Sequence, residues 1–259
     1  FFPWWMVAVL CLFAGCASMK EQHRSYSRSA FLSFQKAMEE FEDEDFIEAQ
    51  KHFATVVERF PYSKYAIIAE IRLADCRFEQ GEYMAAADAY RRFAKFHPTN
   101  NKVPYALFRV GLCHYKQIPT EWFILPPAYE KDQSEVKRAR SELAGFLERH
   151  PKGKLAKKAR ELLRDCNRRL ASHELYVAEF YFRRDKYQAT VQRAKTLLKR
   201  YSGTDLDREA MVLMARAYSS MGRTDLARRT YEEIMKRFPQ SAEAREAQEE
   251  VLELLRERS

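Results

Sequence analysis

Hydrophobic and small residues recur in one fixed register along the chain. Three stretches, 44–61, 81–98 and 222–239, each end in a proline, and the same residue types precede it. Counting back from the proline, an apolar residue lies five positions earlier, an aromatic eight earlier and an alanine twelve earlier. The pattern recurs before Pro151 and, more weakly, before Ser202. Apolar residues at this spacing share one helix face, so each stretch is predicted to be an amphipathic helix that ends near the proline.

A second helix is predicted upstream of each of these helices, with a small residue near its centre. The small residues are Ala37, Ala74, Gly111, Ala178 and Ala215. Small side chains let two helices approach closely, and the repeated aromatic residue then fills the space between neighbouring pairs. The units resemble the tetratricopeptide repeat. The predicted fold class is therefore all-α, a tetratricopeptide-like superhelix of five helical hairpins plus a C-terminal capping helix over 242–258.

Two segments depart from the regular spacing. A proline-rich, aromatic insertion, 117–133, separates the two helices of the third hairpin and is predicted to be non-helical. Residues 154–185 contain no glycine or proline, which favours a single helix of about 45 Å. We accordingly divide this part of the chain into N-terminal repeats (29–116), the insertion loop, and C-terminal repeats with the capping helix (134–259).

The inward-facing positions of the first helices change character along the chain. In a solenoid of this kind, the first helix of each hairpin lines the concave side. The first three hairpins carry apolar and aromatic residues there: Phe31, Phe34, Met38, Phe41, Ile68, Ile71, Phe78, Tyr105, Phe108, Leu112 and Tyr115. The last two hairpins are more polar. An apolar strip of this size predicts a groove for an extended or aromatic-ended peptide. The alternative is that these side chains pack the superhelix and the insertion covers them.

The amino terminus has a different composition. Residues 1–15 are uncharged, too short to span a bilayer, and match the apolar part of a secretory signal. Because no basic segment or initiator methionine precedes them, we expect the sequence to be truncated at its start. Phe13-Ala14-Gly15-Cys16 resembles the lipobox of bacterial lipoproteins. This resemblance implies that Cys16 is acylated and that 16–28 form a lipidated tether. The alternative is an ordinary cleaved signal, or a membrane stub, with an incidental cysteine.

The sequence offers no pattern typical of an enzyme. His97 and His150 precede the repeat prolines, where other units have aromatic residues, so both are interpreted as packing residues. No metalloprotease, nucleophile-elbow or phosphate-loop motif occurs. The remaining cysteines, Cys76, Cys113 and Cys166, are predicted to be free, buried thiols. We therefore predict no catalytic residue, metal site or cofactor, and a net charge of +8 alone does not indicate a nucleic-acid partner.

The lipobox, the polar tether and the five hairpins with their insertion and long helix together resemble the BamD family. Its members are lipoprotein subunits of the outer-membrane β-barrel assembly machine. The most specific stretches are 60–66, 174–193 and 237–241. The resemblance implies a non-catalytic scaffold, lipid-anchored on the periplasmic face of the outer membrane. It further implies that the C-terminal hairpins bind the periplasmic domains of BamA, with Arg193 near that contact.

The same resemblance implies that the N-terminal groove receives the C-terminal signals of unfolded barrel proteins, and that other Bam lipoproteins are possible partners. Two other functions stay open at this point. One is a tetratricopeptide lipoprotein adaptor for cell-wall enzymes. The other is an enzyme whose site lies in the insertion, where Trp122, Tyr129 and Asp132 cluster.

Overall fold

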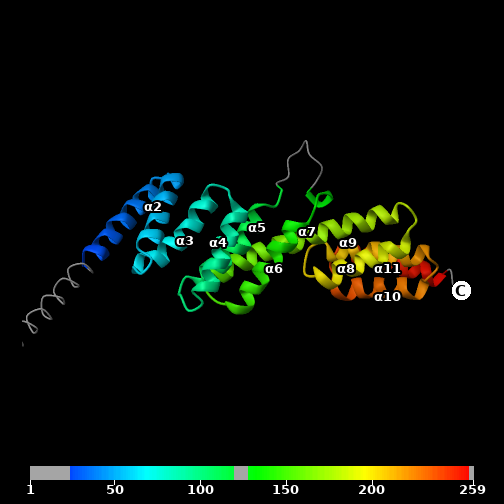
Figure 1. Cartoon of the computed structure of the whole chain (residues 1–259). Helices are drawn as coiled ribbons and strands as arrows, with labels where there is room; N and C mark the ends of the chain where they lie inside the picture. The colour runs from blue at the N-terminus through cyan, green and yellow to red at the C-terminus, as the bar shows by residue number, and fades with distance from the viewer. Residues whose placement is uncertain (1–23, 120–127, 257–259) are drawn as a thin grey trace, which may run out of the picture. The chain divides into compact units, whose positions relative to one another are not determined.

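The described part of the chain is helical almost throughout. The computed structural model describes residues 24–119 and 128–256, and no strand occurs among them (Figure 1). These residues form two compact units, which divide between Lys116 and Gln117. The predicted all-α fold class is therefore confirmed.

Helices of the first unit pack against one another in chain order. They are a helix over residues 24–42, α2 (Phe46–Arg59), α3 (Lys64–Glu79), α4 (Tyr83–Phe96) and α5 (Val103–Lys116). The repeat register forms the core of this unit. In the first hairpin Ala37 and Ala49 are fully buried together with Phe53, and in the second Ala74 and Ala86 are fully buried with Tyr90. Small residues thus lie where two helices meet, and the aromatic ring fills the adjoining space.

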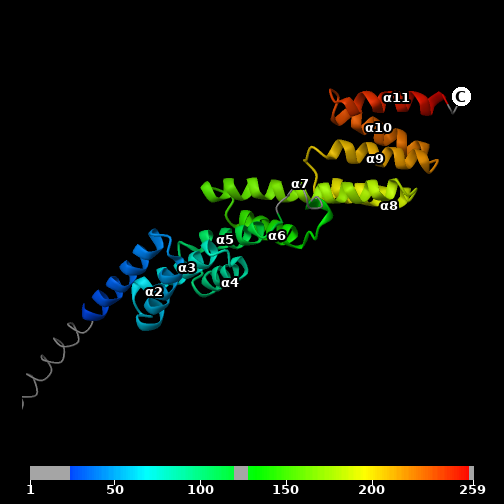
Figure 2. The same cartoon turned by 90° about the horizontal axis from the view of Figure 1, so that it is seen from above.

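The described residues of the second unit form one 3₁₀ helix and six α-helices. They are η1 (Ala128–Glu130), α6 (Ser134–Arg149), α7 (Lys154–Phe182), α8 (Tyr187–Arg200), α9 (Asp207–Ser220), α10 (Thr224–Arg237) and α11 (Ala242–Arg256). The 29 residues of α7 form the predicted long helix, about 44 Å from end to end. From α7 to α11 each helix packs against the next (Figure 2). Ala244, Ala247 and Leu254 of α11 join the core of α9 and α10, which confirms the capping helix.

Hairpin turns share one left-handed residue at the same register. Gly81 and Gly222 have φ angles of 80° and 68°, and the equivalent residues of two other hairpins are Glu44 at 62° and Asp185 at 59°. This backbone conformation is free of steric cost only for glycine. The first and fourth hairpins therefore keep the turn at the expense of some backbone strain in a residue with a Cβ atom.

One predicted boundary and one predicted conformation need correction. Residues 24–28, assigned above to the tether, are helical, because this turn makes tertiary contacts: the Tyr26 ring lies 5.3 Å from that of Phe60. The insertion, predicted to be non-helical, contains η1, where the Tyr129 ring lies 5.1 Å from that of Tyr176 on α7. Cys16 and Trp122 lie outside the described residues. Within residues 24–119 and 128–256, no helix has the length and hydropathy needed to cross a membrane.

Candidate functional site

The eleven predicted groove residues lie on the helix of residues 24–42, on α3 and on α5, but they differ widely in exposure. Phe31 and Ile68 are 44% and 41% exposed. Ile71, Phe78 and Phe108 are buried. The half-buried members of the set are Phe34, Met38, Phe41, Tyr105, Leu112 and Tyr115. Much of the predicted apolar strip is thus covered by the protein's own side chains, and Phe31 and Ile68 present the largest fraction of their surface to solvent.

An aromatic cluster surrounds the exposed residue Phe31. The ring of Tyr65 on α3 stacks on Phe34 at 5.3 Å and lies 5.7 Å from Phe31. Ile68 follows three residues later on α3, so it lies on the same helix face as Tyr65. The repeat register did not single out Tyr65, because that position holds different residue types in the neighbouring units. We call Phe31, Tyr65 and Ile68 the apolar patch.

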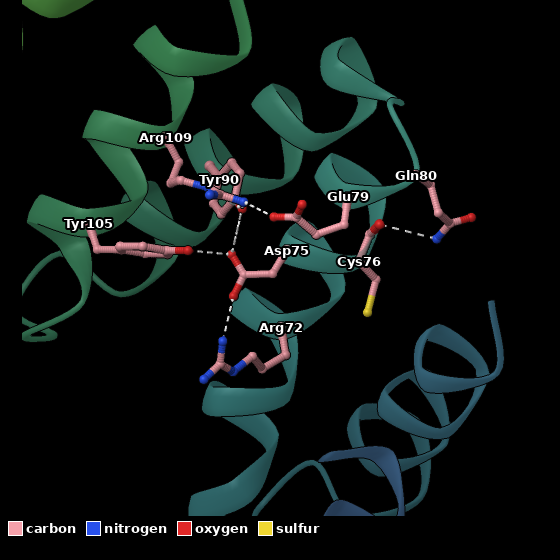
Figure 3. Close-up of polar contacts among 8 residues, drawn as sticks. All are labelled: Arg72, Asp75, Cys76, Glu79, Gln80, Tyr90, Tyr105 and Arg109. Carbon is pink, nitrogen blue, oxygen red and sulfur yellow. Dashed lines mark hydrogen bonds and ion pairs between the residues drawn. The ribbon is translucent and has the colours of Figure 1, made fainter. Parts of the chain in front are cut away.

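A buried carboxylate organises the neighbouring part of this face. Asp75 on α3 is 2% exposed and accepts three hydrogen bonds (Figure 3). The hydroxyls of Tyr90 on α4 and Tyr105 on α5 donate to Oδ1 at 2.5 and 2.8 Å, and Arg72 Nη1 donates to Oδ2 at 3.0 Å. Burial, and next the Asp75 charge, raise the pKa of Tyr90 and of Tyr105. Both hydroxyls therefore stay protonated and act as donors.

Arg109 on α5 completes this network from the other side. Its Nε donates to the Tyr90 hydroxyl at 3.0 Å and its Nη2 to Glu79 at 3.1 Å. The guanidinium carbon lies 3.7 Å from the centre of the Phe78 ring, a cation–π contact (Figure 3 shows the polar contacts). Two arginines thus face two carboxylates, and the network joins α3, α4 and α5. We call these residues the Asp75 network.

A signal for this network was present in the sequence. Arg72 and Arg109 are 37 residues apart and occupy the same register in successive units. Asp75 occupies the register of Met38 and Leu112, where the neighbouring units have apolar residues. An acid in an apolar register, combined with two arginines in an equivalent register, indicates a buried ion-pair network. The position of Arg72, one turn after Ile68 and 35% exposed, places a cation beside the apolar patch.

In the second unit, Arg193 forms a specific contact. Its Nη1 lies 3.2 Å from Glu174 Oε2 on α7, and the Glu174 side chain is 12% exposed while that of Arg193 is 42% exposed. Arg193 therefore neutralises a largely buried carboxylate and still presents part of its side chain to solvent.

Nearby, Thr190 replaces the repeat alanine of α8 and is fully buried, with its hydroxyl 3.3 Å from the Ala178 carbonyl.

A cleft of mixed polar and apolar lining lies where η1 covers α7. Its volume is about 230 Å³, and its lining consists of Tyr129, Ser172, Leu175, Tyr176, Glu179 and Leu206. Burial, and next the charge of Glu209, raise the pKa of Glu179. Of the insertion residues considered for catalysis, Tyr129 lines this cleft, whereas Asp132 accepts hydrogen bonds from the amide and hydroxyl of Ser134. Asp132 therefore stabilises the turn before α6.

The histidines and thiols singled out from the sequence are packing residues. The rings of His97 and His150 lie 5.0 and 5.4 Å from those of Phe93 and Phe146, as the packing interpretation predicts. The three thiols are free and buried, which confirms the prediction, and burial raises the pKa of each to about 12. Within the described ranges, no three His, Cys, Asp or Glu side chains form a group that could hold a metal ion.

Comparison with known proteins gives one consistent result. Residues 27–232 match the sequence model of the YfiO family, described as an outer membrane lipoprotein, and residues 212–253 match that of a tetratricopeptide repeat. Three curated relatives all carry the name outer membrane protein assembly factor BamD. The relative from Vibrio cholerae is 25% identical over 85% of this chain and 92% of its own length. The relative from Neisseria meningitidis serogroup A is 26% identical over 80% of this chain and 79% of its own length. The relative from Caulobacter vibrioides is 24% identical over 90% of this chain and 74% of its own length.

Proposed function

Because the chain belongs to the YfiO family of outer membrane lipoproteins, we propose that it is a non-catalytic scaffold for the assembly of outer-membrane β-barrel proteins. The observation that carries the proposal is the family match, which extends over 27–232 and therefore includes helices of both units. The relatives are named as assembly factors, and a name of that kind denotes no catalysed reaction. In this proposal acyl chains on Cys16 hold the protein at the periplasmic face of the outer membrane.

Copurification tests the overall role. The acylated full chain is isolated from solubilised membranes, and its partners are identified by mass spectrometry. Recovery of the barrel-forming subunit BamA is the expected result. Recovery of a peptidoglycan hydrolase without BamA would contradict the proposal and would instead support a tetratricopeptide adaptor for cell-wall enzymes.

The first unit, in this proposal, binds the C-terminal segment of an unfolded barrel protein. Such a segment ends in an aromatic side chain and a free carboxylate. The apolar patch supplies Phe31, Tyr65 and Ile68 for the aromatic ring, and the partly exposed Arg72 supplies a cation for the carboxylate. Ile68 and Arg72 lie one turn apart on α3, which supports simultaneous contact of adjacent groups of one peptide end.

Fluorescence anisotropy with a labelled ten-residue peptide that ends in phenylalanine tests this site. The change Ile68→Ser is expected to weaken binding about fivefold, because part of the roughly 1.5–3 kcal/mol available from burying an apolar side chain is lost. Amidation of the peptide carboxylate is expected to weaken binding by a similar factor, because the charge-assisted hydrogen bond is removed. Ile47→Ser is the matched control, since Ile47 is 61% exposed on α2 outside the patch. Equal affinities for the native protein and Ile68→Ser would contradict the site.

The second unit, in this proposal, binds the periplasmic domains of BamA, and Arg193 contributes to that contact. Its exposed fraction supports a role at a surface, but its bond to Glu174 complicates a simple substitution. Arg193→Ala leaves a largely buried carboxylate without its partner and is expected to lower stability as well as binding. Arg193→Lys keeps the positive charge and is expected to retain most of the binding.

A double variant separates folding from recognition. Arg193→Gln combined with Glu174→Gln removes both charges, so stability is expected to return toward that of the native protein. Binding to the purified periplasmic domains of BamA, measured by surface plasmon resonance, is expected to remain weak. A double variant that binds as tightly as the native protein would contradict a direct role for Arg193.

A further inference from the structure

The first unit has opposite charges at its two ends. One end carries exposed bases and two exposed aromatic residues: Arg24, Arg28, Arg59, Lys64, Lys95, Lys102, Tyr62 and Phe96. We call this the basic end; its acidic neighbours among the described residues are Glu58, near the end of α2, and Glu70, which pairs with His97 at the end of α4. The opposite end of the hairpins carries more acidic residues, Glu39, Glu40, Glu42, Asp43, Glu44, Asp45, Glu79 and Glu82, than bases, which include Arg77 and Lys116 in the last turns of α3 and α5. The charge of the unit is therefore strongly polarised along its helix axes.

Contacts in the structure explain why the basic residues lie at one end. The two helices of a hairpin are antiparallel, so the start of the helix over 24–42 lies beside the end of α2. The Tyr26 hydroxyl accepts a hydrogen bond from the Tyr62 amide at 3.3 Å, which joins that start to the turn after α2. In the second hairpin His97, at the end of α4, lies 2.7 Å from Glu70 in the first half of α3.

The bases of this end are available to a partner. All six are exposed, and none forms an ion pair with another residue of the described ranges, although Lys64 Nζ lies 5.2 Å from the centre of the Tyr65 ring, a cation–π contact. The two aromatic side chains also project into solvent, with Tyr62 94% and Phe96 69% exposed. A surface of unpaired cations and exposed aromatic rings is the composition that binds a lipid–water interface.

We propose that the basic end of the first unit docks on an anionic phospholipid surface, so that the unit stands on the membrane by this end. The inference rests on the anchor at Cys16 in the proposed function. Cys16 precedes Arg24 by eight residues, which span at most about 28 Å even when fully extended. An acyl chain at Cys16 therefore keeps the basic end close to the lipid head groups and raises its effective concentration there.

This arrangement has a consequence for the candidate peptide site. Docking through the turns after α2 and α4 leaves the acidic end directed away from the membrane. The apolar patch lies on the helices near their basic ends, because Phe31, Tyr65 and Ile68 all belong to the first eight described residues of their helices. An unfolded membrane-protein segment would then bind within a short distance of the lipid surface.

Site-specific fluorescence tests the docking. The acylated full chain is reconstituted into vesicles, with an environment-sensitive nitrobenzoxadiazole label on Tyr62→Cys or on Phe96→Cys. The described native thiols, Cys76, Cys113 and Cys166, are buried, and acylation blocks the thiol of Cys16, so the label attaches to the introduced cysteine. Ile47→Cys, exposed at the start of α2 near the acidic end, is the matched control. We expect at least a twofold rise in emission at positions 62 and 96 with 30% phosphatidylglycerol, and no rise at position 47.

Charge reversal and salt provide the decisive comparisons. The variant with Arg59→Glu, Lys64→Glu and Lys95→Glu is expected to lose the emission rise, as is the native sequence in 0.5 M salt. Similar emission at all three labelled positions, or a rise that is the same in neutral phosphatidylcholine vesicles, would overturn the inference. Mass spectrometry of the amino-terminal peptide tests acylation in the same sample. A non-acylated Cys16 would overturn both this inference and the proposed anchor, whereas loss of BamA copurification would leave the vesicle result unaffected.

Discussion

Replacement of Asp75 by asparagine is a demanding test of the Asp75 network. Asparagine has nearly the same shape, and its Oδ1 can still accept the hydroxyls of Tyr90 and Tyr105. Its Nδ2 group, however, is a donor that faces Arg72 Nη1, also a donor, which is 3.0 Å away in the native protein. Asp75→Asn therefore removes a charge and one hydrogen bond with little change in volume.

The expected loss of stability follows from these contacts. A hydrogen bond to a charged acceptor contributes about 1 kcal/mol more than one between neutral groups, so the two tyrosine bonds together lose about 2 kcal/mol. The Arg72 bond contributes about 1 kcal/mol more, a modest amount because Arg72 is 35% exposed and can turn toward water. We therefore expect the free energy of unfolding to fall by about 3 kcal/mol.

Urea unfolding followed by circular dichroism measures this loss. The control is Asp88→Asn, because Asp88 pairs with Arg91 at 3.1 Å but its side chain is 63% exposed. That change is expected to cost about 0.5 kcal/mol or less. A cost for Asp75→Asn below about 1 kcal/mol, or one equal to that of the control, would refute the reasoning that a buried carboxylate joins the three helices.

Four further predictions concern other parts of the chain. The three buried thiols, whose pKa burial raises to about 12, are expected to resist a thiol reagent at pH 8 and to react fully in urea; rapid reaction of the folded protein would contradict their burial. Thr190→Val is expected to lower the free energy of unfolding by about 1 kcal/mol, through loss of the hydroxyl bond across α7 and α8, and no change in urea unfolding would disprove that role. Glu44→Gly is expected to stabilise the first unit by about 0.5–1 kcal/mol, because glycine adopts the left-handed backbone without steric cost, whereas Gly81→Ala is expected to destabilise it by about 1 kcal/mol. A lower melting temperature for Glu44→Gly than for Gly81→Ala would contradict backbone strain at Glu44. The folded-state pKa of Glu179 is raised by burial and then by Glu209, so the folded protein holds this proton more tightly than the unfolded chain and loses stability as the pH rises past the unfolded value. Glu179→Gln should therefore raise the melting temperature at pH 7 more than at pH 4. An equal rise in melting temperature at both pH values would contradict a raised pKa of Glu179 in the folded protein.

Local periodicity explains why most of the fold could be predicted. A helix places every third and fourth residue on one face, so the recurring alanine and aromatic positions define both the helix and its buried side. Ala49 and Phe53 are fully buried as the pattern requires, and the 29 residues of α7 follow from the absence of glycine and proline. The free thiols followed from the same register.

Turn strain and polar bonds could be predicted only in part. Glycine occupies the left-handed position at 81 and 222, as its conformational freedom favours, but nothing in the local sequence required the left-handed backbone of Glu44 or Asp185. The bond between Arg193 and Glu174 joins residues 19 positions apart on different helices. Such contacts depend on the rotation of one helix against another, which periodicity does not specify.

The sequence by itself determined which residues belong to each helix and which face of the helix is inward, because both are properties of a single segment. Only the tertiary structure decided how deep each inward residue lies, because depth depends on side chains that another repeat contributes. Phe34 and Ile71 occupy the same register in successive units, yet Phe34 is half-buried and Ile71 is only 3% exposed. Asp75 shares the register of two apolar residues and is buried only because tyrosines and arginines from three helices converge on its carboxylate.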